Sequence, residues 1–199
     1  IVAQDKKEEE PVWAKGRPKT DAAMKMAPVA APPVPTPAGE LPKLKAPAGF
    51  KVEVYAPGVL DARALRRGDK GTVFVSTLFV AGKVYAVTGP AGKREIKTIV
   101  KDTPLVSGID YHKGALYVAT PKKITRYDDI ESKLDNPPQP VQVTDNLPGD
   151  DHHGWKFIKF GPDGRLYVPV GAPCNICGVD ENRHALIMSF KADGSDRQI

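Results

Sequence analysis

The chain has 199 residues, 41% of them hydrophobic, and a formal net charge of +5 with a pI near 9.1. This length suffices for the core of one domain, and 20 prolines with 18 glycines favour many turns and short strands over long helices. The 29 basic residues are spread along a chain that also carries 24 acidic ones, which argues against a nucleic-acid-binding protein, and no stretch approaches the ~20 apolar residues of a transmembrane helix.

Residues 1–48 differ from the remainder in composition. A short charge run is followed by a Pro/Ala-rich stretch, Met26–Gly49. Such a segment buries too little apolar surface to fold, and proline favours extended, solvated backbone. We therefore predict a disordered tail or linker over residues 1–48, with a proline-rich docking motif as the alternative reading, and a folded domain over 49–199.

Short runs rich in Val, Ile, Tyr and Phe recur from Phe50 onward, separated by turn residues. The first, Phe50–Ala56, alternates apolar and polar residues as a half-buried strand does. Ten further runs follow up to residue 194, and the stretch Asp128–Asp135 is the one short helical candidate. This spacing predicts an all-β fold, either a sandwich, a barrel or a propeller.

A repeated pattern selects among these all-β architectures. Three stretches share a polar residue, a glycine, one further residue and then an apolar–aromatic–Val run: Lys70–Thr77, Lys113–Thr120 and Asp163–Val170. Their glycines, Gly71, Gly114 and Gly164, are 43 and 50 residues apart, a period typical of propeller blades. In each unit the turn is expected to lead into an inner strand. About three blades fit into 49–199, and closed propellers usually have at least four, so we expect the N-terminal half of a longer propeller.

The first chemistry-bearing stretch is Asp150-Asp151-His152-His153. If it is extended, neighbouring side chains point to opposite sides and a pocket can use only one of the two histidines. Imidazole suits general-base work near neutral pH, and Asp150 or Asp151 is the candidate carboxylate to orient it. A polar loop with two exposed histidines is the alternative.

The second such stretch contains the chain's two cysteines, Cys174 and Cys177. A CxxC pair can serve as half of a metal site, a redox pair, a haem attachment or a local disulfide. Gly178 follows where haem attachment needs histidine, a zinc site would need ligands beyond His184, and the βαβ context of thioredoxin-like motifs is absent from the pattern. A disulfide in an oxidising compartment is the preferred reading, with two free thiols as the alternative.

The stretches His152–Cys177 and Ser107–Glu131 resemble the PQQ-dependent soluble sugar dehydrogenases, particularly the L-sorbosone dehydrogenase branch. The resemblance covers residues 50–199 and implies part of a six-bladed β-propeller. It also implies a periplasmic or secreted quinoprotein that oxidises an aldose or sorbosone-like sugar. The catalytic base of that family lies eight residues before the glycine of the "GPDG" turn, which is His153 in this chain. His152 is then a candidate cofactor- or substrate-binding residue.

The chain departs from the family pattern at Ala172, where some relatives carry an aspartate that orients the base. Asp150 or Asp151 is the candidate replacement. The resemblance implies PQQ and Ca²⁺ as cofactors, with the calcium ligands and the other PQQ contacts expected beyond Ile199. We therefore predict no metal ligand in this segment and an inactive fragment within an active full-length enzyme. A sugar is the expected partner, and the sequence specifies no electron acceptor.

Two other functions fit a propeller. Metal-dependent lactonases use acidic and Asn ligands at the central channel, whereas the candidates here are histidines. A non-catalytic binding propeller would use its loops to hold a protein or polymer, and Ala172 in place of the orienting aspartate leaves this alternative open.

Overall fold

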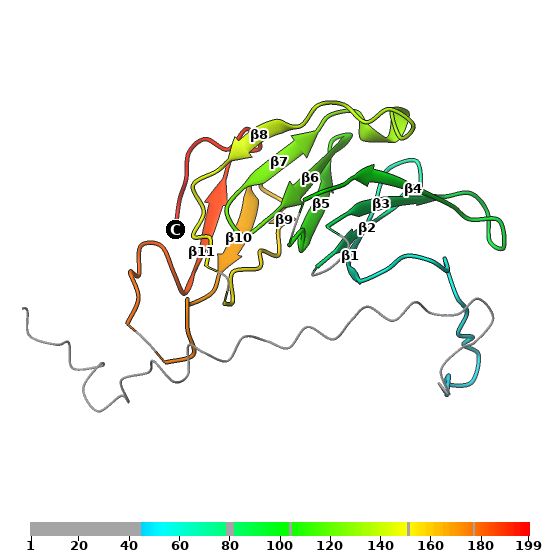
Figure 1. The fold of residues 1–199 in the computed structure, drawn as a ribbon, viewed down its shortest axis with the longest axis horizontal. Coiled ribbons are helices and arrows are strands. Elements are labelled where there is room, and N and C mark those ends of the chain that lie inside the picture. The colour runs from blue at the N-terminus through cyan, green and yellow to red at the C-terminus, as the bar shows by residue number, and fades with distance from the viewer. Residues whose placement is uncertain (1–44, 79–81, 104, 151, 177) are drawn as a thin grey trace, which may run out of the picture.

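The structure is a computed structural model that describes residues 45–199 except 79–81, 104, 151 and 177. Its strands form three antiparallel sheets side by side (Figure 1), two of four strands and one of three. The first sheet contains β1 (Ala62–Arg67), β2 (Val73–Thr77), β3 (Val84–Thr88) and β4 (Glu95–Val100). The second contains β5 (Gly108–His112), β6 (Ala115–Ala119), β7 (Ile124–Tyr127) and β8 (Val141–Thr144). The third contains β9 (Lys159–Phe160), β10 (Leu166–Val170) and β11 (Leu186–Phe190).

Each sheet is a meander of the kind that forms a propeller blade, and consecutive strands are hydrogen-bonded neighbours within it. The first strands of the sheets, β1, β5 and β9, contact one another in series and are therefore the inner strands. The predicted all-β class with about three blade-like units is confirmed. The predicted boundary at residue 48 stays a prediction, because residues 1–44 lie outside the described residues.

The repeated motif occupies β2, β6 and β10, which are second strands, so its predicted place on the inner strand was wrong. Apolar runs of this kind are needed where a strand is covered on both faces, and all five residues of β6 are buried. The predicted turns do precede these strands. Gly71, Gly114 and Gly164 have φ angles of 90°, 82° and 75°, in the left-handed region that glycine tolerates best.

Two local predictions differ from the structure. Phe50–Ala56 forms no strand and Phe50 is 75% exposed, because alternation alone supplies no neighbouring strand to pair with. The inner strand β1 was missed, since its sequence Ala-Arg-Ala-Leu-Arg-Arg lacks β-branched residues and becomes a strand through pairing with β2. The helical candidate at 128–135 reduces to one 3-10 turn, η3 (Ile130–Ser132).

Two apolar clusters join the sheets face to face, and this packing holds the three sheets in a fan. The cluster between the first and second sheets contains Phe74, Val84, Ala86, Ile99, Val100, Val106, Ile109, Leu116, Val118, Tyr127 and Ile130. The cluster between the second and third contains Ala115, Tyr117, Ala119, Ile124, Val143, Leu147, Ile158, Leu166, Val168, Val170, Met188 and Phe190.

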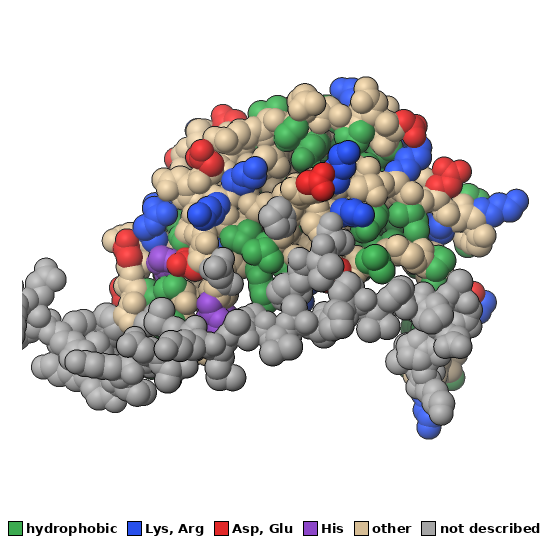
Figure 2. All heavy atoms as spheres, in the orientation of Figure 1, with side chains coloured by type: hydrophobic (Ala, Val, Ile, Leu, Met, Phe, Trp, Pro, Cys, Tyr) green, Lys and Arg blue, Asp and Glu red, His purple; other side chains and the backbone are tan. Residues whose placement is uncertain are grey.

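Basic and acidic side chains are interspersed on the face shown in Figure 2. The described part of the chain contains no helix that is long and apolar enough to cross a bilayer.

Candidate functional site

Two loops at one end of the sheets form the candidate site. The first, Pro148–Phe157, lies in the connection from the outer strand β8 to the inner strand β9. The second, Gly171–Ala185, connects β10 to β11. Three side-chain contacts described below join the two loops, so they form one unit.

His153 adopts a left-handed backbone conformation with φ of 52°, which is uncommon for a residue with a β-carbon. Gly171 lies against it. A Cβ at position 171 would be 2.7 Å from the carbonyl oxygen of His153 and 2.9 Å from its Cβ. Strained backbone of this kind persists where its surroundings hold it, and it concentrates at functional sites.

The ring of His153 is oriented by a main-chain group. Its Nδ1 lies 3.1 Å from the carbonyl oxygen of Ala172. A carbonyl oxygen can only accept, so Nδ1 must carry the proton in this contact. In the neutral ring this leaves Nε2 with its lone pair. His153 is an exposed residue. The ring is therefore held in the tautomer that can accept a proton at Nε2.

The two histidines do not point to opposite sides, which corrects the expectation built on an extended segment. Residues 152 and 153 form a bend, and their ring centroids are 3.9 Å apart with a 48° interplanar angle. The positive φ of His153 breaks the alternation that an extended strand would impose. His152 Nε2 also lies 3.3 Å from Oδ1 of Asn175, so the neighbouring ring is anchored to the second loop.

Asp150 pairs with a different histidine from the one expected. Its Oδ2 lies 2.9 Å from Nε2 of His184, whose side chain is 15% exposed. Asp150 thus links the two loops, whereas the Ala172 carbonyl oxygen orients His153. The other candidate orienter, Asp151, lies outside the described residues. Residue type could not reveal the carbonyl group, because every residue carries one.

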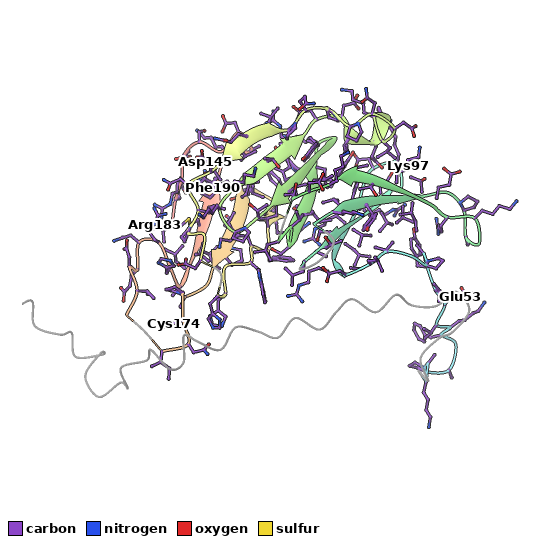
Figure 3. The ribbon with its side chains drawn as sticks, in the orientation of Figure 1. Glu53, Lys97, Asp145, Cys174, Arg183 and Phe190 are labelled. Carbon is purple, nitrogen blue, oxygen red and sulfur yellow. The ribbon has the colours of Figure 1, made fainter. Side chains whose placement is uncertain are left out.

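Cys174 is 3% exposed and disulfide-bonded. Figure 3 shows it in the loop that follows β10. Its predicted partner, Cys177, lies outside the described residues, so the pairing between these two stays a prediction. Asn175, the anchor of His152, directly follows Cys174.

Lys156 is a site residue that sequence reasoning missed. It is 1% exposed, and its ammonium donates hydrogen bonds to the carbonyl oxygens of Pro148 and Gly154. Burial lowers its pKa to about 8, against the opposing effect of the Asp150 charge. A signal was present in the sequence, because Lys156 stands two residues before the buried Ile158 and so falls on the apolar face of the run.

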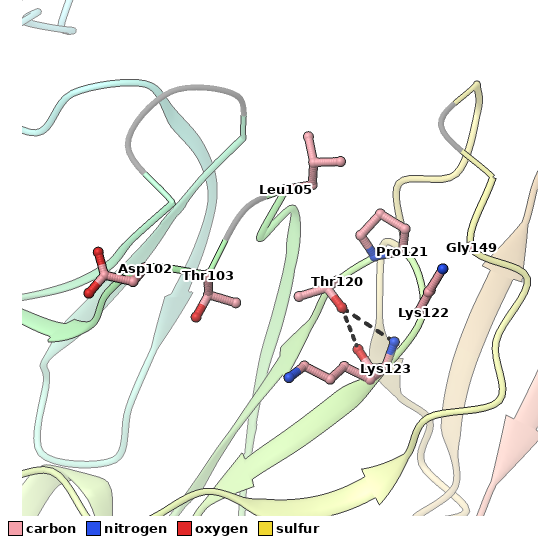
Figure 4. A pocket seen from close by; sticks show the side chains of 8 residues that line it. All are labelled: Asp102, Thr103, Leu105, Thr120, Pro121, Lys122, Lys123 and Gly149. Carbon is pink, nitrogen blue, oxygen red and sulfur yellow. Dashed lines mark hydrogen bonds between the residues drawn. The ribbon is translucent and has the colours of Figure 1, made fainter.

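Two cavities flank the first loop. One of about 520 Å³ is lined by residues 63–66 of β1 and by Trp155, Lys156 and Phe157 of the loop, and the Arg66 guanidinium lies 5.1 Å from the centre of the Phe157 ring. Another of about 400 Å³ borders Gly149 (Figure 4). The residues that line it besides Gly149 are Asp102, Thr103, Leu105, Thr120, Pro121, Lys122 and Lys123. Gly149 before the histidines and residues 155–157 after them thus line spaces large enough for a small polar ligand, and neither histidine is among the lining residues.

The described residues contain no group of three or more His, Cys, Asp or Glu side chains placed to hold a metal ion. A calcium site needs six to eight oxygen ligands. The described part of the chain does not by itself fit Ca²⁺.

No protein-family model matches the chain. An uncharacterised protein of Borreliella burgdorferi is 24% identical over an alignment of 167 positions, and the alignment covers 78% of this chain and 42% of that protein. The chain thus spans less than half the length of this curated relative.

Several solved structures share the fold. The PQQ-bound aldose sugar dehydrogenase of Streptomyces coelicolor matches 72% of this chain and 48% of its own, with 21% identity and a TM-score of 0.55. The PQQ domain of pyranose dehydrogenase from Coprinopsis cinerea matches 70% of this chain and 35% of its own, with 15% identity and a TM-score of 0.54. A calcium structure of a Trichoderma reesei carbohydrate-active enzyme of family AA12 matches 83% and 41%, with 17% identity and a TM-score of 0.58.

These matches show that the three sheets share the fold of part of each of these proteins, two of which are named for PQQ. The resemblance noted in the sequence is confirmed at the level of fold.

Proposed function

We propose that this chain is part of a PQQ-dependent sugar dehydrogenase in which His153 is the general base. The orientation of the His153 ring carries this proposal. The contact between Nδ1 and the Ala172 carbonyl oxygen leaves Nε2 free to accept a proton at an exposed position. Fold similarity to PQQ-dependent sugar dehydrogenases supports the class of reaction.

In the proposed reaction Nε2 of His153 takes the proton of a sugar hydroxyl group as the hydrogen on the same carbon leaves as hydride. PQQ, when bound, supplies the acceptor for that hydride. A positioned base lowers the barrier because it removes the proton before a full negative charge develops on the sugar hydroxyl oxygen. This effect accelerates a reaction by roughly 10²–10⁴-fold. The proton on Nδ1 stays on Nδ1 throughout, hydrogen-bonded to the Ala172 carbonyl oxygen, and this acceptor stabilises the imidazolium that forms.

His152 and Asn175 keep the base in place. The His152 ring packs beside that of His153, and Asn175 limits its rotation by a contact of 3.3 Å. The Asp150–His184 pair fastens the same loop on its other side. Because a misplacement of about 1 Å can cost 10²-fold in rate, such anchoring serves catalysis directly.

Calcium enters the proposal only as a cofactor of the full-length enzyme, since the described residues do not form a site for it. We place the protein in the periplasm or outside the cell, and the disulfide at Cys174 supports an oxidising compartment.

The decisive experiment reconstitutes the full-length protein with PQQ and Ca²⁺ and follows dye reduction by aldoses and sorbosone. We expect sugar-dependent turnover that falls by at least about 10² in His153→Gln, because the base is lost. The control is His112→Gln, since His112 stacks on Phe160 at the other end of β5 and lies outside the two loops.

Failure to bind PQQ in calorimetry would refute the proposed class. Full turnover in His153→Gln would refute the assignment of the base. Lactone hydrolysis without PQQ would instead support a propeller lactonase.

A further inference from the structure

Lys156 is a charged side chain that the fold encloses almost completely. It is 1% exposed, so its ammonium does not reach solvent as lysines commonly do by extending along a surface. Enclosing an ammonium group costs free energy unless hydrogen bonds replace its water. Here the replacements are two main-chain carbonyl oxygens, those of Pro148 and Gly154.

These two carbonyl groups bracket the segment 149–153, which ends at His153. Pro148 precedes the segment and Gly154 follows it directly. Gly154 also packs against the carbonyl group of Asp150, so the chain turns back on itself within five residues. The ammonium of Lys156 therefore joins the start of the histidine loop to its end.

The main chain of Lys156 is fixed to the second sheet. We call the Lys156 side chain, with the two carbonyl groups that it binds, the clamp. Ser107, which precedes β5, accepts a hydrogen bond from the Lys156 main-chain nitrogen at 3.1 Å and donates one to its carbonyl oxygen at 3.3 Å. The Lys156 main chain also lies against Gly108. A rigid strand thus holds Lys156, and Lys156 holds the loop.

We propose that Lys156 is the positioning residue of the base, and that its ammonium closes the loop so that the His153 ring meets the Ala172 carbonyl oxygen. The proposal rests on the function inferred for His153. Lys156 does not touch the reacting atoms in it. Its contribution is the geometry that keeps the proton on Nδ1 and the lone pair on Nε2.

An apolar residue at position 156 could not replace the hydrogen bonds of the charged ammonium group. Ammonium-to-carbonyl bonds are stronger than neutral ones, and one ammonium can serve two acceptors. The charged groups around it are Asp150, which pairs with His184, and Arg63 and Arg66, which line the same cavity. Because burial lowers its pKa to about 8, the clamp weakens as pH rises above that value.

The test compares Lys156→Met, which keeps the length and loses the charge, with Lys156→Arg, which keeps the charge. Lys101→Met, at an exposed lysine after β4, is the matched control. In the full-length protein, ¹⁵N NMR of the His153 ring reports the tautomer, and hydrogen exchange reports opening of residues 152–154.

We expect Lys156→Met to mix the two tautomers and to speed exchange of these amides about tenfold, as loss of a buried charge-assisted bond implies. Lys156→Arg should retain part of the wild-type tautomer signal, and Lys101→Met all of it. A folded Lys156→Met protein with unchanged ring signals and exchange would overturn the proposal.

If Lys156→Met does not fold, the wild-type protein answers the question by titration. The His153 ring signals should then change with a midpoint near pH 8, and Lys156→Arg should abolish that step. Ring signals that stay constant from pH 7 to about 9.5 would contradict the clamp.

Dye reduction separates this proposal from the proposed function. A protein that binds no PQQ but shows the tautomer change in Lys156→Met has the clamp without the dehydrogenase activity. If the protein is a dehydrogenase and Lys156→Met changes neither kcat nor the His153 ring signals, the proposed function holds and the clamp is refuted.

Discussion

Arg66 of β1 donates its Nε hydrogen to Oδ1 of Asp110 on β5 over 2.8 Å, and this ion pair joins the inner strands of the first two sheets. The Asp110 side chain is 1% exposed. Its Oδ2 accepts the main-chain hydrogen of Phe160 at 2.6 Å, and Lys159 lies 3.1 Å from Oδ1. A single buried carboxylate therefore contacts all three sheets.

Asp110→Ala should destabilise the protein by about 3–5 kcal/mol, because it leaves a part-buried guanidinium and a main-chain N–H without their acceptor. The midpoint of urea unfolding measures the effect. Asp135→Asn is the control, since Asp135 is 87% exposed in its pair with Lys97 and its loss should leave the midpoint unchanged. Equal effects of the two substitutions would show that Asp110 is not a junction of the sheets.

Gly171→Ala should disturb His153, the proposed base, and leave the fold intact, because the added Cβ meets His153 at 2.7–2.9 Å. We expect a loss of about 10²-fold in kcat and a change in the His153 ring signals, for a displacement on the order of 1 Å. Gly164→Ala is the contrasting variant. Its Cβ meets nothing within 4 Å, but φ is 75°, so it should cost about 1 kcal/mol of stability without changing His153. The prediction fails if Gly171→Ala retains wild-type kcat.

The lowered pKa of Lys156, about 8, gives stability a defined pH dependence. Between about 8 and the value of about 10.4 expected for an unfolded lysine, the unfolded chain binds more protons than the folded one. The free energy of unfolding should therefore rise with pH across this window. Lys156→Met should remove the rise, which urea titrations at pH 7.5, 8.5 and 9.5 on both proteins would detect. A parallel pH profile in the variant would exclude Lys156 as its source.

Glu131 on η3 is predicted to hold the second sheet to the turn before β2. Its carboxylate accepts hydrogen bonds from the main-chain nitrogens of Lys70 at 3.0 Å and Thr72 at 3.3 Å and from the Tyr111 hydroxyl group at 2.8 Å. Glu131→Ala should cost about 1–3 kcal/mol in the free energy of unfolding.

The loss of stability at acid pH gives a second test of Glu131. Burial alone would raise the pKa of Glu131, but these hydrogen bonds outweigh it and the pKa is lowered. The stabilisation is therefore present above the unfolded value of about 4.3 and is lost as pH falls through the folded pKa. In Glu131→Ala the melting temperature should therefore depend less on pH in that range. An unchanged loss of stability at acid pH would contradict the assignment.

The disulfide at Cys174 should be local and should support the second loop. Peptide mapping without reductant is expected to show a link to Cys177. Closing so short a loop stabilises by about 2 kcal/mol at most, so Cys174→Ser should lower the melting temperature only modestly. It should also free Asn175 and broaden the His152 ring signals. A reducible dimer in place of the internal link would exclude the local pairing.

Much of the fold could be predicted from local signals. The strands β2, β6 and β10 each carry an apolar–aromatic–Val run after a glycine, and these signals mark the middle of every sheet. The inner strand β1 could not be found in this way, because its arginine-rich sequence forms a strand only through pairing with β2 and the ion pair between Arg66 and Asp110. For the same reason Phe50–Ala56, with the better alternation, remains irregular.

The sequence by itself determined the all-β class, the blade period and the turns at Gly114 and its equivalents, since each depends on residue types at fixed spacing. The role of His153 follows from the resemblance to sugar dehydrogenases and stays a prediction. Only the tertiary structure decided what surrounds that histidine. The Ala172 carbonyl oxygen reaches it from the second loop, and the enclosed ammonium of Lys156 binds the carbonyl groups of Pro148 and Gly154 on either side of it. A main-chain oxygen leaves no mark on residue type.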